Sequence, residues 1–215
     1  MNSKFKLLIF DWDGTLSDSV SRIVACIQRA AAENNLPIPS FDRAANIIGL
    51  GLGEAIAQLF PEADELLVTQ MTKSYSAHYR SKDAGPGEFF PNVLATLSQL
   101  RSTGCLLAVA TGKSRAGLNR AFIASGLDDL FHDSRCADET ASKPNPLMLA
   151  ELLQEFNVTA DQALMVGDTE YDMDMAERIS MPRLGVSYGA HHADRLKKYK
   201  PIACIDCFSD IIKHI

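Results

Sequence analysis

A short apolar stretch that ends in two aspartates constrains the fold of this chain more than any other feature. LLIFDWDGT spans residues 7–15 and places four apolar residues directly before Asp11 and Asp13. Uninterrupted apolarity predicts a strand buried on both faces, as in a parallel sheet covered by helices. Two carboxylates at the end of a buried strand are unfavourable unless a cation neutralises them. The stretch therefore predicts a parallel sheet with a charged site at its edge.

Three later stretches share this apolar character. They read CLLAVAT (105–111), ALMVGD (163–168) and MPRLGVS (181–187), each bounded by glycine, proline or a polar residue. Helical patterns separate them, for example PNVLATLSQLRSTG (91–104) and KPNPLMLAELLQEF (143–156), in which apolar residues recur every three or four positions. This alternation predicts an α/β fold with a Rossmann-like parallel sheet and helices on both faces.

One region interrupts the alternation directly after the first strand. Between residue 18 and about residue 82 there is no strand-like run, and apolar residues follow helical spacing. We therefore expect an inserted all-helical cap domain over residues 17–87, within a core made of residues 1–16 and 88–215. The stretch DAGPG at 83–87 predicts a hinge between the two.

Reactive side chains follow the ends of the expected strands. The first strand runs into Asp11, the second into Thr111 and the third into Asp168, with Asp172 four residues later on one side of an expected helix. Ligands bind beyond the carboxyl ends of parallel strands, so these groups and Lys143 should converge. Clustered carboxylates need a cation, and oxygen ligands suit Mg²⁺. A lysine beside the metal favours an anionic substrate.

The first motif also suggests a reaction. An aspartate such as Asp11 can attack phosphorus and form an acyl phosphate. Asp13, two residues later, can protonate the leaving oxygen and then activate water. We expect the backbone amides of Gly14 and Thr15 to form an anion-binding nest. Together these residues predict phosphoryl transfer from a small phosphorylated metabolite.

Four motifs in this order resemble those of the haloacid dehalogenase-like hydrolases, over nearly the whole chain. They are DWDGT (11–15), Thr111, Lys143 in SKPNP, and GDTEYD (167–172). The helical insert resembles the cap of the phosphoglycolate phosphatase-like branch. The resemblance implies a nucleophile at Asp11, a general acid/base at Asp13, and catalytic roles for Thr111 and Lys143. It further implies metal ligation by Asp11, Asp13 (through its main-chain carbonyl), Asp168 and Asp172, and substrate binding by Gly14, Thr15, Thr111, Gly112 and Lys143.

Several activities occur on this framework. The resemblance implies that an acid at position 13, here Asp13, favours transfer to and from oxygen, and that Thr15 favours hydrolysis over mutase chemistry. We therefore expect a Mg²⁺-dependent phosphatase for a small phosphomonoester, with phosphoglycolate as the first candidate. A sugar-phosphate mutase, a pyrophosphatase and a catalytically silent binding protein of the same fold remain as alternatives.

Composition limits the partners and the compartment. The formal net charge is -6, which argues against nucleic acid as a partner. No apolar run approaches the ~20 residues of a membrane helix. The apolar run at 7–10 is shorter than the roughly 7–15 residues of a signal-peptide core, and five cysteines suit a reducing environment. We expect a cytoplasmic protein, and the sequence leaves its oligomeric state open.

Three other features attract attention without joining the four motifs. GLGLGEAI (49–56) lies in the expected cap, where a loop facing the substrate is plausible. His191 and His192 are adjacent, so they should point apart, and we expect both to be exposed in a loop. Cys204 and Cys207 have metal-site spacing but lack a second pair of ligands, so PIACIDCF (201–208) is better interpreted as a short strand.

Overall fold

The computed structural model describes residues 4–81 and 88–215. Within these residues, six parallel strands form one sheet in the order β3-β2-β1-β4-β5-β6. The strands are β1 (Leu7–Phe10), β2 (Leu106–Thr111), β3 (Asp133–Cys136), β4 (Ala163–Gly167), β5 (Arg183–Val186) and β6 (Cys204–Ile205). The four main expected strands and the short C-terminal strand are confirmed, whereas β3 was not predicted.

Helices cover both faces of the sheet, as the sequence predicts. They are α5 (Val93–Ser102), α6 (Arg115–Ser125), α7 (Leu147–Glu155), α8 (Glu170–Glu177), α9 (Ala193–Lys197) and the 3₁₀ helices η2 (Ala160–Gln162) and η3 (Phe208–Lys213). Along β1, Leu8 and Phe10 join one apolar cluster with residues of α5, α6 and η3. Leu7 and Ile9 point to the other face and join a second cluster with residues of α7 and α8. The continuous apolarity of β1 thus reflects burial on both sides.

The position of β1 in the sheet determines where a ligand can bind. From β1 the chain builds β2 and β3 on one side, and it then returns to place β4 on the other side. A change of direction of this kind opens a crevice at the carboxyl ends of the central strands. Phe10 is in register with Val109 of β2 and Val166 of β4. The residues that follow these strands therefore emerge at one place.

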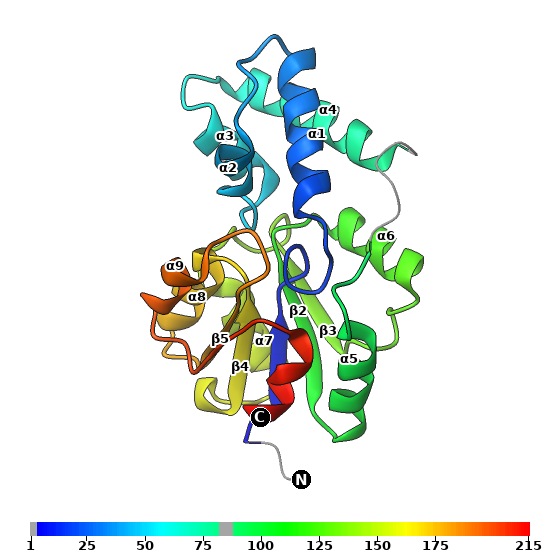
Figure 1. Ribbon diagram of the computed structural model, residues 1–215, viewed down its shortest axis with the longest axis vertical. Coiled ribbons are helices and arrows are strands. Elements are labelled where there is room, and N and C mark those ends of the chain that lie inside the picture. Colours follow the sequence, from blue (N-terminus) through cyan, green and yellow to red (C-terminus); the bar gives the residue numbers. More distant parts are fainter. Residues whose placement is uncertain (1–3, 82–87) are drawn as a thin grey trace.

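Four helices stand above this edge of the sheet (Figure 1). They are α1 (Val20–Glu33), α2 (Phe41–Ala45), α3 (Leu52–Leu59) and α4 (Glu65–Arg80), which we call the insert. The insert has an apolar cluster that includes Ile23, Ile27 and Ile48. The expected stretch of helices is therefore present. The division at residues 17 and 87 remains a prediction, and DAGPG at 83–87 lies outside the described residues.

The two chain segments that connect the insert to the core lie side by side. Asp18 N–H donates to Glu88 O at 2.8 Å, and Phe90 N–H donates to Leu16 O at 3.0 Å. Ser17 forms an antiparallel bridge with the second segment. The insert therefore joins the core through one short two-stranded ribbon. None of the helices in residues 4–81 and 88–215 combines the length and apolarity needed to cross a bilayer.

Candidate active site

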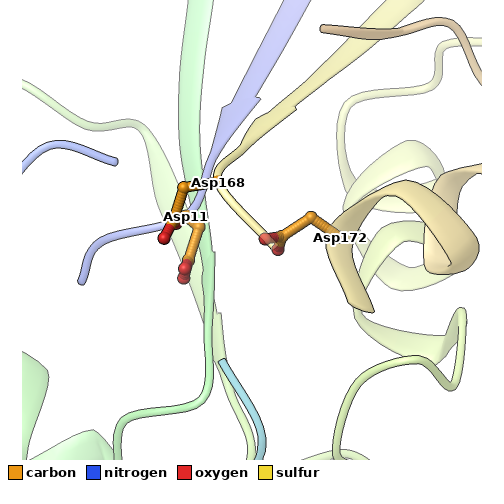
Figure 2. Close-up of side chains that lie close together, drawn as sticks. All are labelled: Asp11, Asp168 and Asp172. Carbon is orange, nitrogen blue, oxygen red and sulfur yellow. The ribbon is translucent and has the colours of Figure 1, made fainter. Parts of the chain in front are cut away.

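Three aspartates meet at the carboxyl edge of the sheet (Figure 2). Asp11 follows β1, Asp168 follows β4, and Asp172 lies in the first turn of α8. One carboxylate oxygen from each lies within 4.8 Å of the other two. All three residues are buried. The structure therefore brings together three of the expected metal ligands, and we call this group the triad.

Lys143 is the cation that accompanies the triad. Its Nζ lies 2.8 Å from Asp11 Oδ1 and 2.7 Å from Asp172 Oδ1, and its side chain is fully buried. Burial alone would lower the pKa of Lys143, but the charges of Asp11 and Asp172 raise it above its ordinary value. Lys143 is therefore positively charged, and one ammonium group faces three carboxyl groups.

The pKa values of Asp11 and Asp168 indicate that positive charge is in deficit at this site. Burial raises the pKa of Asp11 well above its usual range, against the opposing effect of Lys143. Burial, together with the neighbouring charge of Asp172, raises the pKa of Asp168 to about 7. A raised carboxyl pKa means that the ionised form lacks sufficient compensation. A further cation would supply that compensation.

The triad fits a divalent cation on a second ground. Asp11 Oδ2 is buried and has no hydrogen-bond partner in the part of the chain that the structure describes. A buried carboxylate oxygen without a partner is unfavourable, so it indicates a group that the site is built to bind. Mg²⁺ prefers a small number of hard oxygen ligands. Asp11, Asp168 and Asp172 therefore suit Mg²⁺, whereas the side chain of Asp13 lies outside the triad.

Asp168 is held by Thr15 of the first motif and by Ala190 in the loop after β5. Thr15 Oγ1 donates to Asp168 Oδ1 at 2.7 Å, and Ala190 N–H donates to Oδ2 at 2.7 Å. Gly14 has a φ of +82°, and a Cβ there would lie 2.2 Å from Asp168 Oδ2, so only glycine fits. The expected nest is wrong for Gly14, because its N–H donates to Ser17 O at 2.9 Å as the chain turns.

Asp172 is positioned by the start of its own helix. Thr169 donates to Asp172 Oδ2 through both its N–H (3.1 Å) and its Oγ1 (2.7 Å). The two residues form a reciprocal capping box, which leaves Oδ1 for Lys143. Sequence reasoning missed Thr169, although its spacing from the acid three residues later is typical of a helix start.

Asp13 has a separate set of partners. Lys113 Nζ lies 2.8 Å from Asp13 Oδ2, and Ser19 Oγ donates to Oδ1 at 2.6 Å. Lys113 Nζ also donates to the hydroxyl of Tyr79 in α4 at 3.4 Å. Burial alone would lower the pKa of Lys113, but the charge of Asp13 raises it. Lys113 was not predicted as a site residue, although it follows Thr111 by two residues.

The second motif lies where the core meets the insert. Thr111 is buried at the end of β2. A Cβ on Gly112 would lie 2.4 Å from Leu50 O, so the backbone of the insert loop packs directly on this glycine. Nearby, Gly51 N–H donates to Ser142 Oγ at 2.7 Å. The glycine-rich loop of the insert (residues 49–53) therefore lies directly over the second motif.

A cavity of about 880 Å³ separates the insert from the core. Asp11, Asp13 and Thr111 line it from the core, and the glycine-rich loop and Tyr79 line it from the insert. The other members of the triad and Lys143 are not among the lining residues. Asp11, the nucleophile expected from the sequence, therefore faces the cavity. Asp168, Asp172 and Lys143 lie behind it, away from the cavity wall.

His191 differs from its expectation. It is buried, its Nδ1 accepts from Glu170 N–H at 3.1 Å, and its Nε2–H donates to Asn46 O of the insert at 3.1 Å. The loop after β5 folds beneath the insert, and burial lowers the pKa of His191. His192 is exposed, as expected. The exposed-loop prediction is therefore wrong for the first histidine only.

Comparisons with known proteins agree with this geometry. The model of the family described as haloacid dehalogenase-like hydrolase matches residues 8–186. "Probable phosphatase IndB" of Dickeya dadantii is 36% identical over 211 residues, covering 96% of this chain and 91% of that protein. Phosphoglycolate phosphatase of Haemophilus influenzae is 30% identical over 221 residues, covering 99% of both chains.

Solved structures agree as well. A crystal structure described as a predicted phosphoglycolate phosphatase, from Haemophilus somnus, superimposes with a TM-score of 0.88 at 28% identity. That alignment covers 100% of this chain and 99% of the other. The expected fold class and hydrolase activity are thereby confirmed. The chain belongs to the haloacid dehalogenase-like hydrolase family.

Proposed function

We propose that the chain is a Mg²⁺-dependent phosphatase that hydrolyses a small phosphomonoester through an aspartyl-phosphate intermediate. The main support is the environment of Asp11, which borders the cavity while its Oδ2 has no partner among the described residues. A carboxylate held beside a buried ammonium, with one oxygen uncommitted, is suited to attack an electrophile.

The residues around Asp11 suit a phosphoryl group. Asp11, Asp168 and Asp172 would hold the metal, together with the main-chain carbonyl of Asp13. A bound Mg²⁺ would neutralise phosphoryl oxygens and hold them in front of the nucleophile. Thr111 borders the cavity and can donate its hydroxyl to the same oxygens. The Lys143 ammonium would fix the orientation of the Asp11 carboxylate and oppose the negative charge that develops on phosphorus.

The reaction then follows in two steps. An Asp11 oxygen attacks phosphorus, the bond from phosphorus to the alcohol oxygen breaks, and Asp13 gives its proton to that oxygen. In the second step Asp13 takes a proton from water, which attacks phosphorus, releases inorganic phosphate and restores Asp11. Ser19 and Lys113 hold the Asp13 side chain at the cavity wall, where it can reach both oxygens.

The names of relatives suggest the first substrate to test. Proteins that match over nearly the whole chain include several phosphoglycolate phosphatases. We therefore propose phosphoglycolate as the starting point for a substrate panel. A structure named as a putative beta-phosphoglucomutase is 18% identical, and this supports only a common fold.

The cysteines support a reducing compartment. All five are free thiols, and three of them are buried. Cytosolic chains keep thiols reduced, whereas secreted chains tend to pair them. We therefore propose that the protein acts in the cytoplasm on a metabolite.

Hydrolysis of an aryl phosphate with and without Mg²⁺ tests the proposal directly. We expect turnover that chelation removes, Mg²⁺ restores, and Asp11→Asn abolishes. Asp194→Asn is the matched control, because Asp194 is exposed and pairs with Lys197. Absence of turnover on the aryl phosphate and on a panel of phosphometabolites would identify a catalytically silent protein. Conversion of a sugar phosphate without release of phosphate would identify a mutase, and preferential cleavage of pyrophosphate would identify a pyrophosphatase.

A further inference from the structure

Three arginines line the cavity without a carboxylate partner among the described residues. They are Arg22 of α1, Arg80 of α4 and Arg120 of α6. The chain has 27 acidic and 21 basic residues, so carboxylates are not scarce. Elsewhere, ion pairs with carboxylates engage Arg115, Arg135, Arg178, Arg183 and Arg195. Three guanidinium groups therefore stand on the wall of this cavity without a carboxylate to neutralise them among the described residues.

Arg22 shows most directly that a partner is absent. Its Nη2 donates to Tyr79 O at 2.7 Å, and its guanidinium lies 4.2 Å from the centre of the Tyr79 ring. These contacts fix the side chain in one place. Its Nε is buried and has no partner in residues 4–81 and 88–215. A buried guanidinium N–H normally has an acceptor, and the geometry of arginine matches a carboxylate or a phosphate.

The carboxylates of the cavity do not supply that acceptor. Asp13 pairs with Lys113, and Asp11 contacts Lys143. Asp138 accepts from a backbone N–H at 2.8 Å. Glu54, the fourth acid of the lining, is exposed. No ion pair joins any of these four acids to the three arginines in the described residues. The positive charge on this wall therefore remains available to a ligand that also reaches Asp11.

The size and lining of the cavity limit that ligand further. Its volume of about 880 Å³ lies at the upper end of the roughly 300–1,000 Å³ typical of sites for drug-sized ligands. Ile23, Ile27 and Ile48 of the insert form an apolar part of the lining. A two-carbon alcohol part such as glycolate would leave most of this space empty.

On the basis of the phosphatase function proposed above, we propose a narrower substrate class. The substrate is a phosphomonoester whose alcohol part is longer than glycolate and carries a second anionic group. Arg22 binds that group, and Arg120, facing the cavity from the core, contributes to the same positive field. Arg22 is then a specificity-determining residue, and the isoleucines contact the intervening carbon chain.

A matched series of substrates tests this class. The first arm consists of phosphorylated hydroxy acids with two, four and six carbons, beginning with phosphoglycolate. The second arm consists of the monophosphates of diols of the same lengths, which lack the second charge. The third arm consists of the corresponding bisphosphates, which show whether the site prefers a carboxylate or a phosphate as the second anionic group. We expect the charged esters with four or six carbons to have the highest kcat/KM.

Variants connect this preference to the arginines. We expect Arg22→Gln to lower the ratio of kcat/KM for charged over uncharged esters about tenfold to a hundredfold, mainly through KM. The double variant Arg80→Gln, Arg120→Gln should lower that ratio by a smaller factor. If Arg22→Gln does not fold, this double variant still tests whether positive charge at the cavity sets the preference. Arg43→Gln is the control, since Arg43 lies in the insert and donates to Leu59 O at 3.1 Å, away from the lining.

The outcomes distinguish this inference from the phosphatase proposal. If no phosphomonoester is hydrolysed, the phosphatase proposal fails and the inference fails with it. If uncharged and charged esters react equally, or if the arginine variants leave the ratio at the parent value, the charge assignment is overturned while the phosphatase proposal stands. If phosphoglycolate is the best substrate of the series, the assignment of a longer alcohol part is overturned.

Discussion

The active site contains two lysine–aspartate pairs, Lys143 with Asp11 and Lys113 with Asp13, and they differ in what surrounds them. Lys143 and Asp11 are at most 1% exposed, and Lys143 pairs with two aspartates of the core, Asp11 and Asp172. Lys113 and Asp13 are 11% and 12% exposed, and they border the cavity. Their further contacts, Ser19 and Tyr79, lie beside or within the insert.

This difference separates two tasks that one catalytic site must perform. The inner pair and its partner Asp172 belong to the core, so we expect the nucleophile to keep its position when the insert moves. The outer pair has partners on both sides of the cavity, so the position of the insert influences the proton-transfer group. Closure of such a cap can exclude water and complete the site. Each prediction below tests whether the two pairs are as different as their surroundings.

The largest effect should come from the inner aspartate. Asp11→Asn removes the nucleophile with little change in shape, and we expect kcat to fall about 10⁴-fold or more. The free energy of unfolding should not fall as it would for a core truncation, because asparagine is nearly isosteric. Steady-state kinetics combined with urea denaturation measures both quantities. Near-parental turnover by the purified variant would contradict the assignment of the nucleophile.

The outer aspartate should matter less. Asp13→Asn keeps the main-chain carbonyl that the resemblance assigns to the metal, so Mg²⁺ affinity should largely survive. The loss of proton transfer should lower kcat about 10²–10⁴-fold. An aryl phosphate with a good leaving group needs less protonation of the leaving oxygen, so the variant should still form the aspartyl-phosphate quickly from it. A pre-steady-state burst of the released aryl alcohol would reveal this. A variant that loses only Mg²⁺ affinity, with normal kcat at saturation, would show that the residue serves the metal instead.

The two lysines should differ in stability. Lys143→Met leaves buried carboxylates without their cation, and we expect a loss of about 3–5 kcal/mol in the free energy of unfolding of the metal-free protein. Lys113→Met should cost about 1 kcal/mol, because water in the cavity can solvate Asp13. Denaturant titration of both variants, in the presence of a chelator, compares them directly. Equal losses would show that the outer pair is as rigidly built as the inner one.

The smallest effect concerns another contact between core and insert. Burial lowers the pKa of His191 below that of the unfolded chain, so the unfolded state binds more protons as the pH falls below about 6.5. Stability should therefore decrease on acidification, and His191→Gln should reduce that decrease by up to about 1 kcal/mol. Urea denaturation of the parent and the variant at pH 7.5 and pH 5 measures how much stability each protein loses on acidification. His192→Gln is the control, and an equal change there would rule out the buried site as the cause.

The sequence predicted the central part of the fold well because the central strands carry a strong pattern. β1 and β4 are apolar throughout and β2 is apolar up to its last residue, Thr111, since both faces of the sheet are covered. Strand β3 reads DSRC and lies at the sheet edge, so neither its composition nor its length distinguished it from a loop. The short helix α2 was similarly hidden, because five residues cannot display a helical period.

The site was predictable where a residue type itself implies chemistry. Asp11, Asp168, Asp172 and Lys143 belong to motifs, and the structure brings them together. Thr169 and Ala190, which hold Asp172 and Asp168, were not predicted, because positioning depends on three-dimensional proximity. Ala190, which binds Asp168 through its N–H, offers no side-chain signal at all. His191 was misjudged because its partner, Asn46 O, is distant in sequence.

The paired ribbon between insert and core has a consequence for how such proteins diverge. The chain leaves the core at Leu16 and re-enters at Phe90, and these two residues are hydrogen-bonded neighbours. Mutation, lengthening or exchange of the intervening segment therefore need not disturb the order of the strands or the reactive aspartates. Inherited chemistry and acquired substrate preference can thus change at separate rates within one gene.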